Sequence, residues 1–146
     1  MGMVYNKLKE FKAKYPGTVA WRISKHAAVV ENYLNPGEEV RFAFPAQKGN
    51  SSMDIFSTFV VVLTNKRILL AQKRLLWGYT YLAITPDMFN DLTVSSGIIW
   101  GKLYIDTVKE TVMLSNISKG AMDDIETEIT EYMIAEKQKY ATKTQG

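Results

Sequence analysis

Residues 59–70 read FVVVLTNKRILL and carry the strongest structural signal in the chain. Two apolar runs, at 59–63 and 68–70, flank the polar tetrapeptide Thr64-Asn65-Lys66-Arg67. β-Branched and aliphatic runs separated by a short polar turn are typical of a β-hairpin. We therefore predict a hairpin at the centre of a β-sheet.

The strand that leads into this turn is apolar on both faces. Side chains alternate along a strand, so Phe59, Val61 and Leu63 share one face while Val60 and Val62 share the other. A strand buried on one face only would alternate with polar residues. A second layer must therefore cover this strand. An N-terminal helical segment and a second copy of the chain are both open as the cover.

Strand-like runs and short turns continue on either side of this hairpin. We predict strands at 39–46, 53–64, 66–73, 79–84, 90–96, 101–106 and 109–114. Seven short strands with regularly spaced turns indicate an antiparallel sandwich or barrel.

Helical periodicity precedes the strand region. Val4, Leu8 and Phe11 recur at helical spacing, which predicts a helix over residues 3–14. Pro16-Gly17 ends it, and Thr18 is a candidate N-cap for a second helix that reaches about residue 34. Asn35-Pro36-Gly37 stops this second helix. The first third of the chain is thus predicted to be a helical hairpin.

Helical periodicity also follows the strand region, over residues 119–138. Acidic residues gather at its start and lysines at its end, an order that complements the helix dipole. Ser118 is a candidate N-cap, and residues 141–146 form a polar tail that we expect to be flexible.

Composition places the chain among ordinary globular domains. Of 146 residues, 47% are hydrophobic and 23% are charged, with a formal net charge of +3. The absence of cysteine excludes disulfides, thiol nucleophiles and zinc–thiolate sites. No apolar run approaches the ~20 residues of a membrane-spanning helix, and the N-terminus lacks the apolar core of a signal peptide. We therefore expect a cytoplasmic protein.

Seven strands followed by one amphipathic helix resemble the pleckstrin-homology (PH) superfold. The segment VLTNKRIL at 62–69 is similar to the LTNKR hairpin of small bacterial PH-like domains, and NPGEEV at 35–40 resembles their lead-in to the first strand. LLWG at 75–78 and SGIIWGKLYI at 96–105 are similar to their later hairpins. The resemblance covers residues 35–135.

The resemblance implies a fold and no catalytic residue. It implies an α+β, mainly β architecture: a seven-stranded antiparallel PH-like sandwich or barrel with a C-terminal capping helix. We expect a helical hairpin at 1–34, a PH-like domain at 35–140 and the tail at 141–146. Eukaryotic PH domains that bind phosphoinositides carry several basic residues in the first loop. Residues 46–52 contain only Lys48, which does not favour that ligand.

The predicted turn after residue 73 is the sharpest candidate binding site. Two cations stand beside three large apolar residues there: Lys73, Arg74, Leu75, Leu76 and Trp77. The tip can fold back onto the helices, contact a partner protein or another copy, or enter a lipid interface. Folding back is the favoured interpretation, because monomers seldom expose large apolar patches.

Other candidate sites are weaker. Lys66 and Arg67, with the two cations of the tip, are a candidate basic strip, but the low net charge argues against nucleic-acid binding. Tyr79, Tyr81 and Tyr104 would form an adhesive patch if the outer face is bare.

Nothing in the sequence predicts catalysis, a metal or a cofactor. His26 is the only histidine and lies on an apolar helix face, where a packed imidazole is the simpler interpretation. The acidic residues at 123–128 lack the spacing of a calcium loop and suit a solvated helix start. We predict a non-enzymatic protein-binding or scaffolding module, for which self-association is a further expectation, with peripheral membrane binding through residues 73–77 as the alternative. A small-ligand carrier or an enzyme is less favoured.

Overall fold

The structure is a computed structural model that describes residues 2–18, 21–49 and 57–145, with side chains as far as residue 139. Its elements in chain order are α1 (Met3–Lys14), α2 (Ile23–Tyr33), β1 (Val40–Lys48), β2 (Thr58–Thr64), β3 (Ile68–Lys73), β4 (Tyr79–Ile84), β5 (Phe89–Ser96), β6 (Trp100–Thr107), β7 (Thr111–Ser118), the 3-10 turn η2 (Lys119–Ala121) and α3 (Met122–Gln145).

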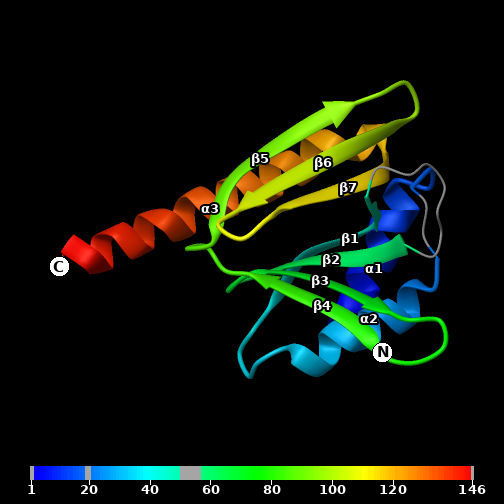
Figure 1. Ribbon diagram of the computed structural model, residues 1–146, viewed down its shortest axis with the longest axis horizontal. Helices are drawn as coiled ribbons and strands as arrows, with labels where there is room; N and C mark the ends of the chain where they lie inside the picture. The colour runs from blue at the N-terminus through cyan, green and yellow to red at the C-terminus, as the bar shows by residue number, and fades with distance from the viewer. Residues whose placement is uncertain (1, 19–20, 50–56, 146) are drawn as a thin grey trace.

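The seven strands form one antiparallel sheet in the order β4-β3-β2-β1-β7-β6-β5, curled into a half-barrel (Figure 1). The helices α1 and α2 pack against the β1–β4 half, and α3 runs along the β5–β7 half (Figure 1). The predicted class, a mainly β antiparallel fold with an N-terminal helix pair and a C-terminal helix, is confirmed.

The central hairpin is closed by Thr64, which satisfies the backbone of its own turn. Its N–H donates to the Arg67 carbonyl (3.0 Å), and its hydroxyl oxygen accepts the N–H groups of Lys66 and Arg67 (both 3.1 Å). Thr107 repeats this arrangement with Glu110 at the β6–β7 turn. Local side-chain bonds of this kind compete with strand pairing. As a result β3 begins two residues later than predicted, and so does β7.

The outer face of β2 is covered by the N-terminal helical hairpin, the pair α1 and α2. Val60 and Val62 belong to one apolar cluster with Val4 and Leu8 of α1 and Val30 of α2, and all five side chains are fully buried. The cover that the two-faced strand required therefore comes from within the chain.

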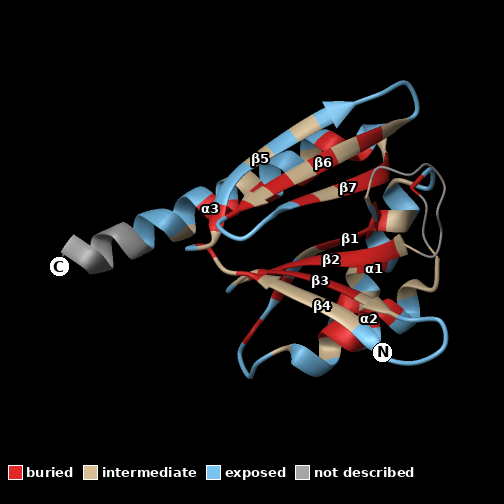
Figure 2. Cartoon of the chain, in the orientation of Figure 1, coloured by how far each residue is buried: buried red, intermediate tan, exposed pale blue. Residues whose placement is uncertain are grey.

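The inner face of β2 lines the main core. Val61 and Leu63 pack in a cluster that includes Ile125 and Ile129 of α3. All seven residues of β2 are buried (Figure 2). The strand that dominates the sequence signal is thus the shared wall of two apolar clusters.

The second helix begins later than predicted. Arg22, with φ of 54°, occupies the left-handed region at the N-cap position, so helical geometry starts at Ile23. Thr18 is not its N-cap, because the Thr18 hydroxyl oxygen accepts the backbone N–H of Ser118 (3.0 Å). This bond ties the N-terminal helical hairpin to the end of β7. Val19, expected on this helix, lies outside the described residues.

The end of the sheet also differs from expectation. β7 continues to Ser118, and η2 separates it from α3, so Ser118 makes no side-chain cap bond. The helix then runs to Gln145, into the segment expected to be a flexible tail. The first part of the strand predicted at 53–64, at residues 53–56, lies outside the described residues.

Candidate functional site

The β3–β4 tip protrudes from the sheet. Arg74 donates its backbone N–H to the Gly78 carbonyl (3.0 Å), and Gly78 has a positive φ of 81° that side-chain-bearing residues rarely adopt. Leu75, Leu76 and Trp77 are 56%, 79% and 76% exposed. The expectation that the tip folds back onto the helices is therefore wrong. The closed hairpin turn holds these side chains away from the N-terminal helices and from α3.

His26 anchors α2 to the base of this tip. Its Nδ1 accepts the backbone N–H of Lys73 (2.8 Å), and the imidazole is fully buried. The pKa of His26 is lowered from 6.5 to about 4. Burial is the main cause, a hydrogen bond to the Trp21 backbone opposes it, and the charge of Arg22 adds a smaller lowering. The histidine is therefore neutral near pH 7 and has a structural role, as the sequence suggested.

A second apolar tip, which the sequence analysis did not identify, lies between β5 and β6. Gly97 donates its N–H to the Trp100 carbonyl (2.9 Å), and the enclosed Ile98 and Ile99 are 92% and 66% exposed. The Lys119 N–H donates to the Ile99 carbonyl (3.3 Å). The sequence did carry a signal for this tip, since Ile98 and Ile99 lie inside a predicted turn. Large aliphatic residues are not needed to form a turn.

Both tips reach the same end of the molecule. In Figure 1 the long axis is horizontal, and the β3–β4 and β5–β6 loops both lie at the end opposite the C-terminus of α3. Figure 2 shows both loops as exposed. Both tips are therefore presented at one end of the molecule.

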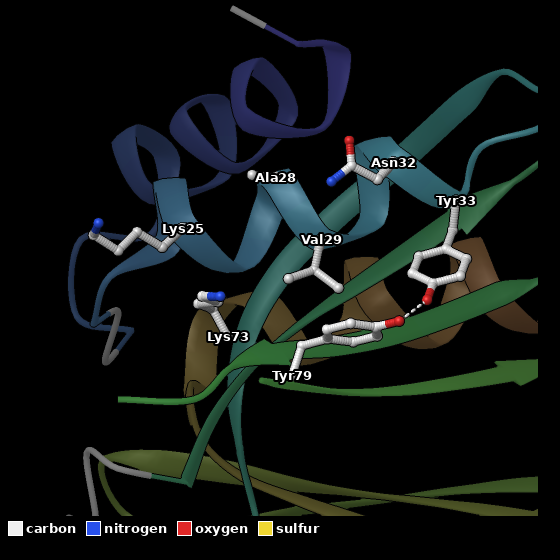
Figure 3. A pocket seen from close by; sticks show the side chains of 7 residues that line it. All are labelled: Lys25, Ala28, Val29, Asn32, Tyr33, Lys73 and Tyr79. Atoms are coloured by element: carbon white, nitrogen blue, oxygen red, sulfur yellow. Dashed lines mark hydrogen bonds between the residues drawn. The ribbon is translucent and has the colours of Figure 1, made fainter. Parts of the chain in front are cut away.

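A groove lies between α2 and the β3–β4 hairpin, next to the first tip. It has a volume of about 690 Å³ and is lined by Lys25, Ala28, Val29, Asn32, Tyr33, Lys73 and Tyr79. Figure 3 shows Lys25 and Lys73 toward one end, Tyr33 and Tyr79 at the other, and Val29 between them. The hydroxyls of Tyr33 and Tyr79 are hydrogen-bonded, which raises the pKa of Tyr33. The groove therefore combines cations, an apolar wall and a phenolic end.

The candidate basic strip is divided by the fold. Arg67 immediately precedes β3 and Lys73 ends it, so the two lie roughly 20 Å apart at about 3.3 Å per residue. Arg67 is also occupied: its Nε lies 3.0 Å from a carboxylate oxygen of Glu38, whose side chain is fully buried. Lys66 remains exposed nearby. These residues do not form a continuous cationic surface.

The Glu38–Arg67 pair has a structural role. Although burial raises it, hydrogen bonds from Arg67 and Thr64 bring the pKa of Glu38 below its ordinary value. Arg67 also donates to the Tyr33 carbonyl (2.9 Å) at the end of α2. The pair therefore links the central turn to the N-terminal helical hairpin.

The three tyrosines of the expected patch are not brought together. Tyr81 stacks on Tyr33 of α2 with ring centroids 4.2 Å apart, and Tyr79 also lies beside Tyr33. Tyr104 lies on β6, which four strands separate from β4 in the sheet. Sequence alternation could assign each tyrosine to a face but could not assign the strand order.

Among the residues that the structure describes, no three His, Cys, Asp or Glu side chains converge as a metal site would require. Asp124, from the acidic helix start, lies 3.0 Å from the Lys14 ammonium and accepts the Tyr15 hydroxyl. Hydrogen bonds from Tyr15 and Lys14 lower the pKa of Asp124. This carboxylate holds α1 against α3.

The half-barrel of seven strands with a C-terminal helix defines a PH-like protein. Residues 34–131 match the bacterial PH domain family, and the chain belongs to that family. The match leaves out both α1 and α2.

Solved structures agree with this fold. A pleckstrin homology domain from Shewanella amazonensis is similar, with 20% identity, a TM-score of 0.52, and coverage of 74% of this chain and 95% of the other. The C-terminal domain of an unknown protein from Leishmania infantum is similar with 14% identity, a TM-score of 0.51, and coverage of 68% and 87%. No curated protein is significantly similar to the chain.

Proposed function

We propose that this protein is a non-catalytic module that docks on an anionic lipid bilayer through its two apolar hairpin tips. The observation that carries the proposal is the position of the tips. The highly exposed side chains of Leu76, Trp77 and Ile98 belong to loops that reach one end of the long axis (Figure 1). A bilayer is a planar partner that engages both tips at once.

The side chains at the tips suit the lipid interface. Tryptophan prefers the headgroup level, where its ring is partly apolar and its N–H is wet. Leucine and isoleucine enter the acyl region, and burying one such side chain fully is worth about 1.5–3 kcal/mol. The described helices include none that is both long and apolar enough to cross a bilayer. The proposed contact is therefore peripheral.

Cationic residues adjoin both tips. Lys73 and Arg74 precede the first tip, and Lys119 contacts the second through its backbone. Each Lys or Arg near an anionic surface contributes about 1 kcal/mol. The proposal concerns bilayer charge and apolar insertion and not one phosphoinositide.

The test is co-sedimentation with vesicles of phosphatidylcholine, with and without phosphatidylglycerol. The pairs Leu76→Ser with Trp77→Ser and Ile98→Ser with Ile99→Ser remove one tip each. We expect each pair to lower partitioning into anionic vesicles by about tenfold or more, since each removes two inserting side chains. Val108→Ser is the matched control, because Val108 is 62% exposed but belongs to the β6–β7 turn.

A second comparison separates charge from insertion. Trp77→Ala combined with Arg74→Ala should weaken adsorption to anionic vesicles, and adsorption of the unaltered protein should fall as salt rises. Adsorption that is unchanged in this double variant, or lowered equally by Val108→Ser, would contradict the proposal.

Self-association stays a prediction, but the structure removes the reason for which it was made. It rested on the second apolar face of β2, and that face packs against α1 and α2. Binding of a partner protein through the tip at residues 73–77, also expected from the sequence, stays a prediction.

A further inference from the structure

The strand β4 forms one edge of the sheet, and its backbone pairs on one side only. Arg74 bonds to Gly78 across the hairpin, so hydrogen-bonded pairs alternate from there along β3 and β4. Thr80, Leu82 and Ile84 therefore direct their backbone groups toward β3. The intervening residues of β4 direct theirs outward.

The outward residues are Tyr79, Tyr81 and Ala83. Each presents one N–H and one C=O at the free edge, and no further strand pairs with β4 in the described part of the chain. Unpaired edge groups in this arrangement are a template for another strand. Within a longer sheet, the neighbour opposite each outward residue would project its side chain to the same face.

That face is the one occupied by α2. Tyr81 and Ala83 pack against the cluster that contains Val29 and Val30, and the Tyr33 ring stacks on Tyr81. The groove between α2 and the hairpin lies on this side (Figure 3). Alternate side chains of an added strand would therefore turn toward the groove.

We propose that the free edge of β4 and the groove beside α2 bind an extended peptide segment of a partner protein, which adds to the sheet as an eighth strand. Main-chain bonds to Tyr79, Tyr81 and Ala83 supply affinity, and the groove supplies selectivity. The segment carries an apolar residue against Val29 and an acidic residue two positions away, toward Lys25 and Lys73.

Charge selects this occupant over a second copy of the chain. Lys25 and Lys73 both line the groove, and the sequence of β4, YTYLAI, contains no acidic residue to meet them. A symmetric β4–β4 pairing would leave the lysines without a carboxylate from that strand. The site also uses α2, which lies wholly outside the matched family residues.

The test uses a fluorescent probe peptide with the sequence Thr-Leu-Thr-Glu-Thr-Val-Thr, capped at both ends, in which Leu, Glu and Val share one face. Binding to the full chain is measured by fluorescence anisotropy, and amide hydrogen exchange reports on β4. We expect saturable binding and slower exchange at Tyr81 and Ala83. Replacing the probe's Glu by Lys should weaken binding by about tenfold, since it opposes two lysines.

Ala83→Pro is the decisive variant. It removes an outward N–H without removing a bond to β3, because proline is tolerated at sheet edges. Ala83→Ser is the matched control that retains the N–H. We expect Ala83→Pro to abolish probe binding while Ala83→Ser binds normally, with both variants showing the native circular dichroism spectrum. Lys25→Glu should reverse the preference between the Glu and Lys probes.

Two outcomes would overturn the proposal. One is the absence of saturable binding up to the solubility of the probe, or binding that Ala83→Pro leaves intact. The other is a dimer in light scattering that Ala83→Pro dissociates, which would make a second copy the occupant. Vesicle adsorption depends on the tips and not on Ala83, so this proposal and the bilayer proposal fail independently.

Discussion

Val62 on β2 and Leu76 on the β3–β4 tip are both large aliphatic residues of one meander, yet their exposures are 0% and 79%. The two residues differ because helices cover only one of them. α1 and α2 pack over the outer face of β2 and β3, whereas the tip extends past the sheet into solvent (Figure 2). The chain therefore covers one apolar surface with its own helices and leaves another bare. Large bare apolar patches on a monomer indicate an interaction surface.

The strongest way to break this contrast is to remove the cover. A chain that begins at Asn35 lacks α1 and α2 and exposes Val60, Val62 and Leu69, which are fully buried in the whole protein. Their burial is worth roughly 5–9 kcal/mol, comparable with the total stability of a domain. We expect this chain to associate in light scattering and to lose its cooperative thermal transition.

Adding residues 1–34 as a separate peptide is the control. If the helices act as a cover, the peptide should reduce the mass of the associated species. A truncated chain that is monomeric and cooperatively folded would show that the helical pair is not needed to cover the sheet.

A matched pair of substitutions sharpens the contrast at single residues. Leu8→Ala opens a cavity beneath α1 and should lower the free energy of unfolding by about 3 kcal/mol. Leu76→Ala removes a similar side chain from the exposed tip and should change it by less than about 0.5 kcal/mol. Urea denaturation measures both. Similar losses for the two variants would mean that the tip is packed against the protein in solution.

His26 lies at the boundary between the two regions, where α2 meets the base of the tip. Its pKa is lowered from 6.5 to about 4, so between these values the unfolded chain binds the proton that the folded protein excludes. The free energy of unfolding is therefore highest above about pH 6.5. It falls by about 3 kcal/mol as the pH is lowered from 6.5 toward 4.

His26→Gln keeps a hydrogen-bond acceptor near Lys73 but does not titrate in this range. We expect the difference in unfolding free energy between the two proteins to shrink or invert as the pH falls from about 7 to about 4. Parallel pH profiles for the two proteins would contradict this assignment.

The sequence predicted many residues of the candidate site, but it did not predict whether they are exposed to solvent. Residues 73–77 stand out by composition alone, and their position in a turn follows from the flanking strands. Exposure depends on whether another segment packs on the tip, which no local pattern reports. Arg67 illustrates the same limit, because its buried partner Glu38 lies 29 residues away. The β5–β6 tip was not predicted as a site, because its glycines indicate a turn but do not report whether Ile98 and Ile99 are exposed.

The sequence by itself determined the local elements. Period-two and period-3.6 patterns set the strands and helices, the Thr64 turn set the central hairpin, and Asn35-Pro36-Gly37 ended α2, because these features depend on neighbouring residues. Only the tertiary structure decided which segment covers β2, that the two tips face one end, and that β4 is left with a free edge beside α2. Those outcomes depend on strand order and on contacts between residues distant in the chain, and the free energy of such packing is shared among many residues that no single segment contains.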